Sequence, residues 1–288
     1  MHYMPSLVFV YAEQFREAGS TVMRGFQLAE LARDGLPGHR VRIAPLGSAI
    51  RNSSLFLTKG ALKVAEPQQL SDLRRAGNRL LFDPVDEVPP PTTARFADVL
   101  VASSLTAFDY FSRAYPATRV ALVNHHVDPR LDRVTPRPDA FRVGYFGETV
   151  NAVLTDAIEE RVDVVPVDTS REHADWLARV PQYTMHYAVR RERALDHFKP
   201  FLKGFTAAHS DAPVLIQRDQ AEALRWLGED YPYLVDAPVD EAVILDALAR
   251  AEREYGGPRW ARAREIMAGI RARTTPTRIV AELRAALA

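Results

Sequence analysis

Short apolar runs alternate along this chain with segments in which apolar residues recur every three or four positions. Such runs are typical of buried strands, and such spacing is typical of amphipathic helices. In the first half of the chain the pattern predicts strands at 7–11, 41–46, 79–83, 98–102 and 119–123. Strands that alternate with helices in this way favour an α/β fold built on a parallel sheet.

The first helix pattern is the clearest in the chain. Val22 and Phe26 belong to an apolar stripe that spans residues 20–33. Ser20 suits an N-cap, because its hydroxyl can accept a bond from an unpaired N–H group, and Gly35 suits the C-terminal end. We therefore expect a helix soon after the first strand.

A proline-containing stretch at residues 133–140 interrupts the alternation and is typical of a linker. After it the pattern resumes and predicts two Rossmann-like domains, residues 1–135 and 136–288, which face each other across a cleft that holds the ligand. The strands predicted in the second domain are 142–146, 162–167, 183–189, 213–217 and 233–235, and the predicted helices are 149–159, 171–177, 193–208, 220–227, 240–255, 259–271 and 276–287.

Composition and charge exclude several classes of function. The 288 residues include 37 Lys and Arg and 37 Asp and Glu, so the net charge is zero, which argues against a nucleic-acid partner. There is no cysteine, which excludes thiolate chemistry and disulfides. No apolar run reaches the ~18 residues of a membrane span. The first apolar run is short and Glu13 closes it, so we expect a cytoplasmic protein without stable membrane insertion.

A glycine ends the first strand of the second domain. Gly147 precedes Glu148 and a predicted helix from Thr149. Without a Cβ, Gly147 lets a phosphate or a sugar approach the backbone, and the N–H groups of that helix would point at the same place. A tight strand-to-helix turn without a ligand explains the glycine equally well.

Basic residues gather after the predicted strand 183–189. Arg190 and Arg191 follow it at once, and Lys199 and Lys203 stand four positions apart near the predicted start of a helix, with Pro200 in its first turn. Cations at a helix N-terminus oppose the macrodipole unless an anion lies there too. A diphosphate would accept hydrogen bonds from these Lys and Arg side chains. A solvated basic helix face is the alternative explanation of the same cations.

The order strand, Arg, Lys-Pro-x-x-Lys-Gly, small-residue helix and Ala-Pro-Val-Leu-Ile resembles the donor half of GT-B glycosyltransferases. The resemblance implies a donor domain that binds a nucleoside diphosphate sugar without a separate cofactor, and a last helix, within 274–288, that crosses back to the first domain. It also implies that Gln217 and Asp219 lie near the ribose and sugar hydroxyls. The glutamate pair of many retaining members is absent, since Phe198 and Thr206 stand at those positions, so inversion and retention both stay open.

The last predicted strand of the first domain ends in candidate acid–base groups. His125 and His126 are adjacent, so their side chains point to opposite sides of an extended chain, and Asp128 follows. A neutral imidazole in the cleft can act as general base on an acceptor hydroxyl, with Asp128 orienting it. A structural hinge is the alternative. Further candidates are the carboxylates Asp83 and Asp86, which follow another strand, and Arg24, which could face the cleft and meet a phosphate or be a surface cation of its helix.

The sequence therefore predicts a glycosyltransferase that transfers a sugar from a nucleoside diphosphate sugar to a hydroxyl of an unspecified glycan, lipid-linked or small-molecule acceptor. No Asp-x-Asp motif and no set of metal ligands is evident, so we expect catalysis without a metal. Two alternatives are another nucleotide-sugar enzyme, such as an epimerase, and a non-catalytic two-lobed ligand sensor.

Overall fold

The structure is a computed structural model that describes residues 4–131, 140–167, 175–191 and 197–288. The predicted linker at 133–140 lies almost wholly outside these residues. Contacts divide the chain into two compact units. The first comprises Met1–His126, Phe198–Pro200 and Pro276–Ala288, and the second comprises Val127–His197 and Phe201–Thr275.

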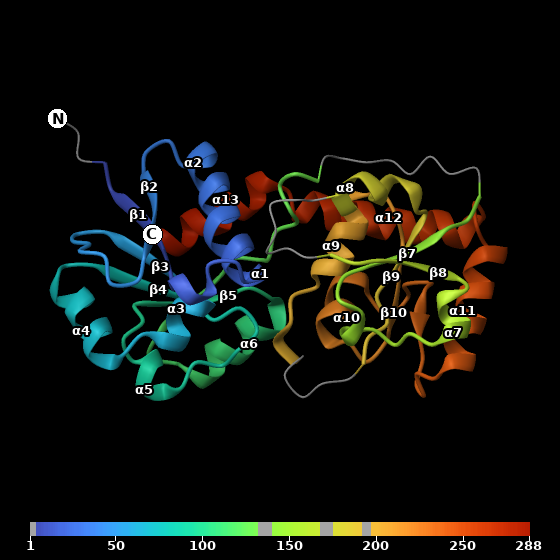
Figure 1. The fold of residues 1–288 in the computed structure, drawn as a ribbon, viewed down its shortest axis with the longest axis horizontal. Coiled ribbons are helices and arrows are strands. Elements are labelled where there is room, and N and C mark those ends of the chain that lie inside the picture. Colours follow the sequence, from blue (N-terminus) through green and yellow to red (C-terminus); the bar gives the residue numbers. More distant parts are fainter. Residues whose placement is uncertain (1–3, 132–139, 168–174, 192–196) are drawn as a thin grey trace. The chain divides into compact units, whose positions relative to one another are not determined.

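The first unit is built on a six-stranded parallel sheet with the order β2-β1-β3-β4-β5-β6 (Figure 1). Its strands are β1 Ser6–Tyr11, β2 Arg40–Pro45, β3 Ser54–Thr58, β4 Arg79–Asp83, β5 Val99–Ala102 and β6 Arg119–Leu122. Sequence analysis did not include β3, since periodicity cannot distinguish a five-residue apolar run from part of a buried helix. The chain adds β2 on one side of β1 and β3 on the other, which makes the gap between β1 and β3 the switch point of this sheet.

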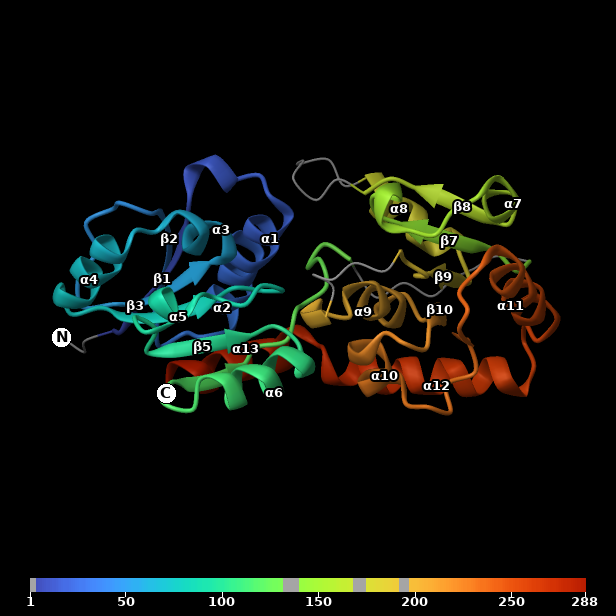
Figure 2. The ribbon, with the colours of Figure 1, turned by 90° about the horizontal axis from the view of Figure 1, so that it is seen from below.

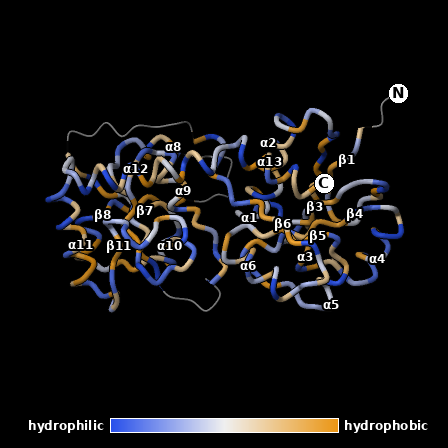
Figure 3. Tube along the Cα trace, turned by 180° about the vertical axis from the view of Figure 1, so that it is seen from behind, coloured by the Kyte–Doolittle hydropathy of each residue, from blue (hydrophilic) through white to orange (hydrophobic). Residues whose placement is uncertain are grey.

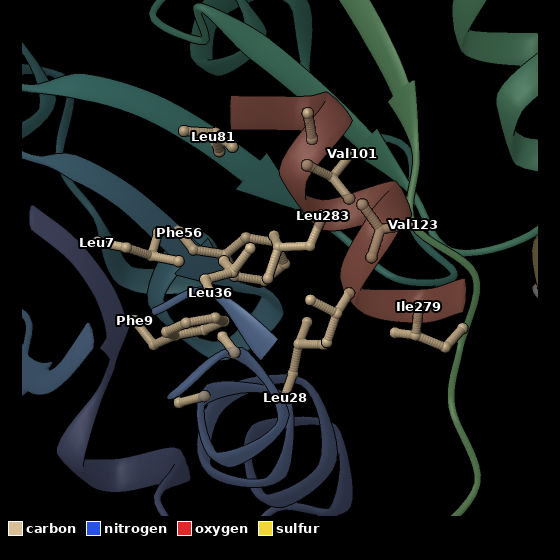
Figure 4. Close-up of a cluster of buried hydrophobic side chains, with 14 of the residues drawn as sticks. Leu7, Phe9, Leu28, Leu36, Phe56, Leu81, Val101, Val123, Ile279 and Leu283 are labelled. Atoms are coloured by element: carbon tan, nitrogen blue, oxygen red, sulfur yellow. The ribbon is translucent and has the colours of Figure 1, made fainter. Parts of the chain in front are cut away.

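Side chains alternate between the two faces of this sheet. On β1, Leu7 and Phe9 pack with one core cluster, whereas Val8 and Val10 pack with another. The first cluster lies under α2 (Leu28–Gly35) and α13 (Pro276–Leu287). Leu283 of α13 packs with the strand residues of this cluster (Figure 4). The C-terminal helix therefore packs on the first unit, as the GT-B resemblance implies. Figure 3 shows the strands as apolar segments.

The remaining helices of the first unit connect these strands. They are η1 Glu13–Phe15, α1 Gly19–Thr21, η2 Val22–Gln27, α3 Lys59–Val64, α4 Pro67–Arg75, α5 Pro91–Ala94 and α6 Leu105–Ala114. The predicted helix at 20–33 is present, but it begins at Gly19 and Ser20 is not its cap. Its middle, η2, is a π-helix, a form that is frequent at functional sites. The hydroxyl of Ser104 caps α6 by accepting a bond from Ala107 N.

The second unit has a five-stranded parallel sheet with the order β11-β10-β9-β7-β8. Its strands are β7 Val143–Phe146, β8 Val162–Val165, β9 Met185–Tyr187, β10 Val214–Gln217 and β11 Leu234–Val235. Every strand predicted in this half is present, and each observed strand is shorter than the predicted one. The chain leaves β7 in opposite directions, to β8 and then to β9, so the switch point lies between β7 and β9.

The helices of the second unit depart from the prediction at two places that bear on the site. They are η3 Thr149–Asn151, α7 Asp156–Glu159, α8 Asp175–Arg179, η4 Val180–Gln182, α9 Leu202–His209, α10 Ala221–Leu227, α11 Glu241–Arg253 and α12 Pro258–Arg273. The predicted helix at 149–159 is only η3 and α7, and the helix predicted from 193 begins, within the described residues, at Leu202. Figure 2 shows α12 running along α9 and α10.

Candidate functional site

The carboxyl ends of β7 and β9 bring several predicted donor residues to the switch point of the second sheet. Gly147 follows β7, and Arg190 lies three residues after β9. In open α/β sheets, ligands bind outside the carboxyl ends of the strands at such a point. This edge of the second sheet is therefore the place where the fold positions a ligand.

Gly147 makes a turn that a side chain would block. Its φ is +150°, and its N–H donates to the carbonyl of Val165 at 3.2 Å. A Cβ at this position would overlap the Lys203 ammonium and lie 3.2 Å from the Tyr145 hydroxyl. Both groups thus lie where Gly147 leaves room, as expected for a backbone that a ligand approaches closely. The long helix predicted from Thr149 is absent, because only the three-residue 3-10 helix η3 begins there.

Lys203 is the cation of α9 that lies at the turn. It is the second residue of the helix, and its ammonium donates to the carbonyl of Phe146 and lies 4.3 Å from the centre of the Tyr145 ring. The expected pairing of Lys199 with Lys203 on one helix face is wrong. The helix begins after Pro200, because the residue before a proline is disfavoured in the helical conformation. Lys199 belongs instead to the Phe198–Pro200 segment of the first unit.

Arg190 is held by Gln217 from the neighbouring strand. The Gln217 side chain accepts from Arg190 N at 2.9 Å and donates to Arg190 O at 2.8 Å. Gln217 is buried, and both ends of its amide bind this backbone, so the structure shows it as a support for Arg190. Asp219 is exposed in the turn after β10 and is not the cap of α10, whose N-cap is Gln220.

Tyr145 is a member of this site that sequence analysis missed, because an aromatic residue in a strand pattern is usually part of a core. Its hydroxyl donates to the carbonyl of Glu148 at 2.7 Å. Burial raises the pKa of Tyr145 to about 12, with the charge of Arg190 lowering this pKa and that of Glu148 raising it. Arg190, Glu148 and Lys203 therefore all lie close to one phenol ring. Glu148 itself is exposed, and its carboxylate accepts from Asn151.

The first unit carries a buried ion pair at the strand ends. Arg24, on η2, donates to Asp83 at the end of β4 through two bonds, at 2.9 and 3.0 Å, and both side chains are completely buried. A third bond joins Arg24 to the carbonyl of Asn124 at 3.0 Å. Arg24 and Asp83 therefore bind each other, and the ideas that Arg24 meets a phosphate and that Asp83 is a base are not supported.

Arg24 and its helix hold the histidine segment after β6. Nδ1 of His125 lies 2.9 Å from the carbonyl of His126, and Nε2 of His126 lies 2.8 Å from the carbonyl of Met23. A carbonyl only accepts, so each of these nitrogens carries the proton. Burial, followed by the charge of Arg24, lowers the pKa of His125 well below its ordinary value of 6.5. His125 is therefore a neutral imidazole whose basic nitrogen is Nε2.

Asp128, the residue expected to orient a histidine, pairs with a nearby arginine. Its carboxylate binds Arg130, accepting from the backbone N and from Nε at 2.9 Å and from the terminal guanidinium nitrogen at 2.7 Å. Asp86, the other carboxylate candidate, pairs with Lys59 at 2.5 Å. Glu87 binds both Lys59, at 3.1 Å, and Lys63, at 2.9 Å, so two cations balance these two carboxylates.

His186, on β9, is a buried histidine near Lys203. It is 3% exposed, its ring lies 4.8 Å from that of Phe146, and Nε2 has no hydrogen-bond partner among the described residues. Burial, followed by the charge of Lys203, lowers the pKa of His186 from 6.5 to about 3. The native protein therefore keeps this side chain neutral over a range of pH in which the unfolded chain is protonated.

This difference in the pKa of His186 between the folded and unfolded states predicts that the protein loses stability in acid. Below pH 6.5 the unfolded state binds a proton that the native state refuses until about pH 3, so the free energy of unfolding falls by about 1.4 kcal/mol per pH unit in this window. For His186 alone this amounts to about 2 kcal/mol between pH 7 and pH 5. Urea unfolding of the wild type and of His186→Phe should show a shallower pH slope for the variant, and equal slopes would contradict the assignment.

The described part of the chain has neither a membrane-spanning helix nor a cluster of metal ligands. No helix there is long and apolar enough to cross a membrane. Among the same residues, no group of three or more His, Asp or Glu side chains is placed to hold a metal ion.

Comparison with known proteins identifies the fold. No protein-family model matches the sequence, and no curated protein matches it. Anabaena HepE, solved in complex with UDP-glucose, has a TM-score of 0.64 at 11% identity, over 98% of this chain and 99% of that one. A glycosyltransferase from Rickettsia africae has a TM-score of 0.66 at 9% identity, over 99% and 98% of the two chains.

A chain of the GtfA/B complex is similar over a smaller part of its own length. Its TM-score is 0.59 at 9% identity, and the match covers 82% of this chain and 57% of that one. The present chain thus spans little more than half of that protein. The two parallel sheets and the overall similarity to these neighbours show that the chain has the GT-B fold of glycosyltransferases.

Proposed function

We propose that this protein is a glycosyltransferase that moves a sugar from a nucleoside diphosphate sugar to a hydroxyl group of an acceptor. The observation that carries the proposal is the cluster at the switch point of the second sheet, where Lys203 lies against Gly147 and the charge of Arg190 acts on the adjacent Tyr145. Backbone without a Cβ and two cations suit a diphosphate. Neighbours of the same fold were solved with UDP and UDP-glucose, which supports a uridine nucleotide as the first donor to test.

The donor half of the mechanism is electrostatic. When the bond between sugar and diphosphate breaks, negative charge grows on the leaving phosphate, and Lys203 and Arg190 would stabilise it in place of a metal. Lys199 remains part of the proposal as a cation of the first unit. Gln217 contributes by fixing the Arg190 backbone, and Asp219 and Glu148 are the carboxylates proposed to meet donor hydroxyls.

The acceptor half is assigned to the histidine segment of the first unit. In an inverting reaction, a neutral imidazole accepts the proton of the attacking hydroxyl while the sugar is transferred. His125 is in that state, with Nε2 as its basic nitrogen. His126 and Asp128 are the other members of the proposed catalytic group.

The direct test is transfer itself. UDP-glucose and other sugar nucleotides are incubated with the protein and with simple sugar acceptors, with and without EDTA, and released UDP and the product are measured. Turnover that survives EDTA supports metal-independent transfer. In parallel, thermal stabilisation by UDP but not by free glucose supports the transferase, whereas stabilisation by glucose alone favours a sensor. Interconversion of the sugar nucleotide without transfer favours an epimerase.

Lys203→Ala should weaken the binding of UDP by about 1.5–3 kcal/mol, or roughly 10- to 150-fold in Kd, because a charge-assisted hydrogen bond to phosphate is lost. Titration calorimetry measures the change. Lys63→Ala is the matched control, since it removes one lysine whose ammonium binds Glu87 in the first unit. Unchanged affinity in a folded Lys203→Ala variant would remove Lys203 from the donor site.

A further inference from the structure

We infer that Tyr145 is the positioning residue of the donor site: its ring and its hydroxyl hold the Lys203 ammonium and the turn at Gly147 where the donor's diphosphate binds. This inference rests on the proposed function. Two separate contacts carry it. The ring centre lies 4.3 Å from Nζ of Lys203, and the hydroxyl donates to the carbonyl of Glu148 at 2.7 Å, which closes the turn around Gly147.

The ring contact restrains a side chain that is otherwise flexible. A lysine side chain has many rotamers and loses most of this freedom when it is fixed in one place. Here the electron-rich face of Tyr145 attracts the ammonium, and the carbonyl of Phe146 accepts one of its hydrogens. The ammonium is thus held beside Gly147 before a ligand arrives, and fixing a binding group in advance raises affinity.

The hydroxyl contact restrains the backbone. Because its pKa is about 12, Tyr145 keeps its phenolic proton at physiological pH and remains a donor to the carbonyl of Glu148. That bond spans the two residues between Tyr145 and Glu148, so it fixes the path of the chain through Gly147. Arg190 and Glu148 also lie near the phenol, as their opposite effects on its pKa show.

Tyr145 is itself anchored by a second tyrosine that provides a control. The ring of Tyr187, on the adjacent strand β9, lies 6.2 Å away in an edge-to-face arrangement, and its hydroxyl donates to the carbonyl of Val153. Tyr187 is the same residue type and is equally buried in the same sheet. The Lys203 ammonium, however, lies over the ring of Tyr145. Substitutions at Tyr187 therefore report the cost of disturbing the aromatic pair and of losing the bond to Val153, with the cation contact at Tyr145 left in place.

The first experiment detects the contact without any ligand. The chain has four lysines, Lys59, Lys63, Lys199 and Lys203, so lysine-labelled protein yields few Cε resonances, and Lys203→Met identifies the one of interest. We expect a ring-current shift of this resonance in the wild type, in Tyr145→Phe and in Tyr187→Leu, and its loss in Tyr145→Leu. A Lys203 resonance that Tyr145→Leu leaves unmoved would overturn the inference.

The second experiment measures the effect on binding with UDP as the probe. Tyr145→Leu should weaken UDP binding about 5- to 30-fold, and Tyr145→Phe, which keeps the ring face, should weaken it less. In the Lys203→Met background, the loss caused by Tyr145→Leu should shrink to that of Tyr145→Phe, because the part of the effect that acts through Lys203 is already gone. Fully additive losses would overturn the inference.

The two experiments separate this inference from the proposed function. If the resonance responds as expected and the wild type does not bind UDP, the donor assignment fails while the positioning of Lys203 by Tyr145 stands. If UDP binds tightly to every variant, Tyr145 has no positioning role although the donor function is supported. Tyr187→Leu should leave UDP affinity close to that of the wild type, and a loss equal to that of Tyr145→Leu would reduce Tyr145 to a structural residue.

Discussion

Replacing His125 by Ala should lower turnover about 10²- to 10⁴-fold and leave the affinity for UDP unchanged, because a general base contributes that much to rate and does not touch the nucleotide. The hydrogen bonds of the ring favour His125 as the base. Its Nδ1 hydrogen is fixed on the carbonyl of His126, so Nε2 is free to act as the base. Its pKa lies well below 6.5, so it is deprotonated throughout the neutral range.

His126→Ala is the matched comparison. His126 is tied to η2 through the carbonyl of Met23, so its loss should affect stability more than the chemical step. Turnover and UDP affinity are measured for both variants, and the anomeric configuration of the product is determined first. Inversion with full turnover in both variants would exclude a histidine base and leave Asp86 as the next candidate. Retention of configuration would remove the need for a base in the first unit.

Local patterns predicted much of the fold. The strand at Arg79–Asp83 was predicted with its observed bounds, because a run of buried apolar residues with polar neighbours determines a strand by itself. The prediction of a long helix from Thr149 was wrong, because local pattern alone does not support a helix. Val150 is 57% exposed and the apolar residues that follow do not form one face, so tertiary packing supplies nothing to support a long helix there.

The candidate site was predictable only in part. Gly147 stood out because a strand-end glycine has a local meaning, and Lys203 and Arg190 stood out as charges beside it. Tyr145 was not predicted, because its role depends on an ammonium 58 positions away in the chain. The partner of Arg24 was hidden for the same reason, since 59 positions separate it from Asp83. A single sequence shows which residues are charged, whereas the fold decides whether a charge meets a ligand or another side chain.

The buried pair of Arg24 and Asp83 leads to the largest expected effect on stability. Asp83→Ala should lower the free energy of unfolding by about 3–5 kcal/mol, because it leaves the Arg24 guanidinium buried without its carboxylate partner. Asp163→Ala is the control, since its pair with Arg142 spans 2.7 Å but is about half exposed, and such pairs contribute about 0–1 kcal/mol. Urea unfolding measures both changes.

The double variant Arg24→Met, Asp83→Leu tests whether the cost comes from the uncompensated charge. Burying two apolar side chains in place of an ion pair is often neutral or stabilising, so most of the stability lost in Asp83→Ala should return. Activity should not return with it, because Arg24 also donates to the carbonyl of Asn124, the residue before His125, and lowers the pKa of His125. A stable double variant with wild-type turnover would show that the ion pair serves folding alone and that the histidine segment keeps its position without it.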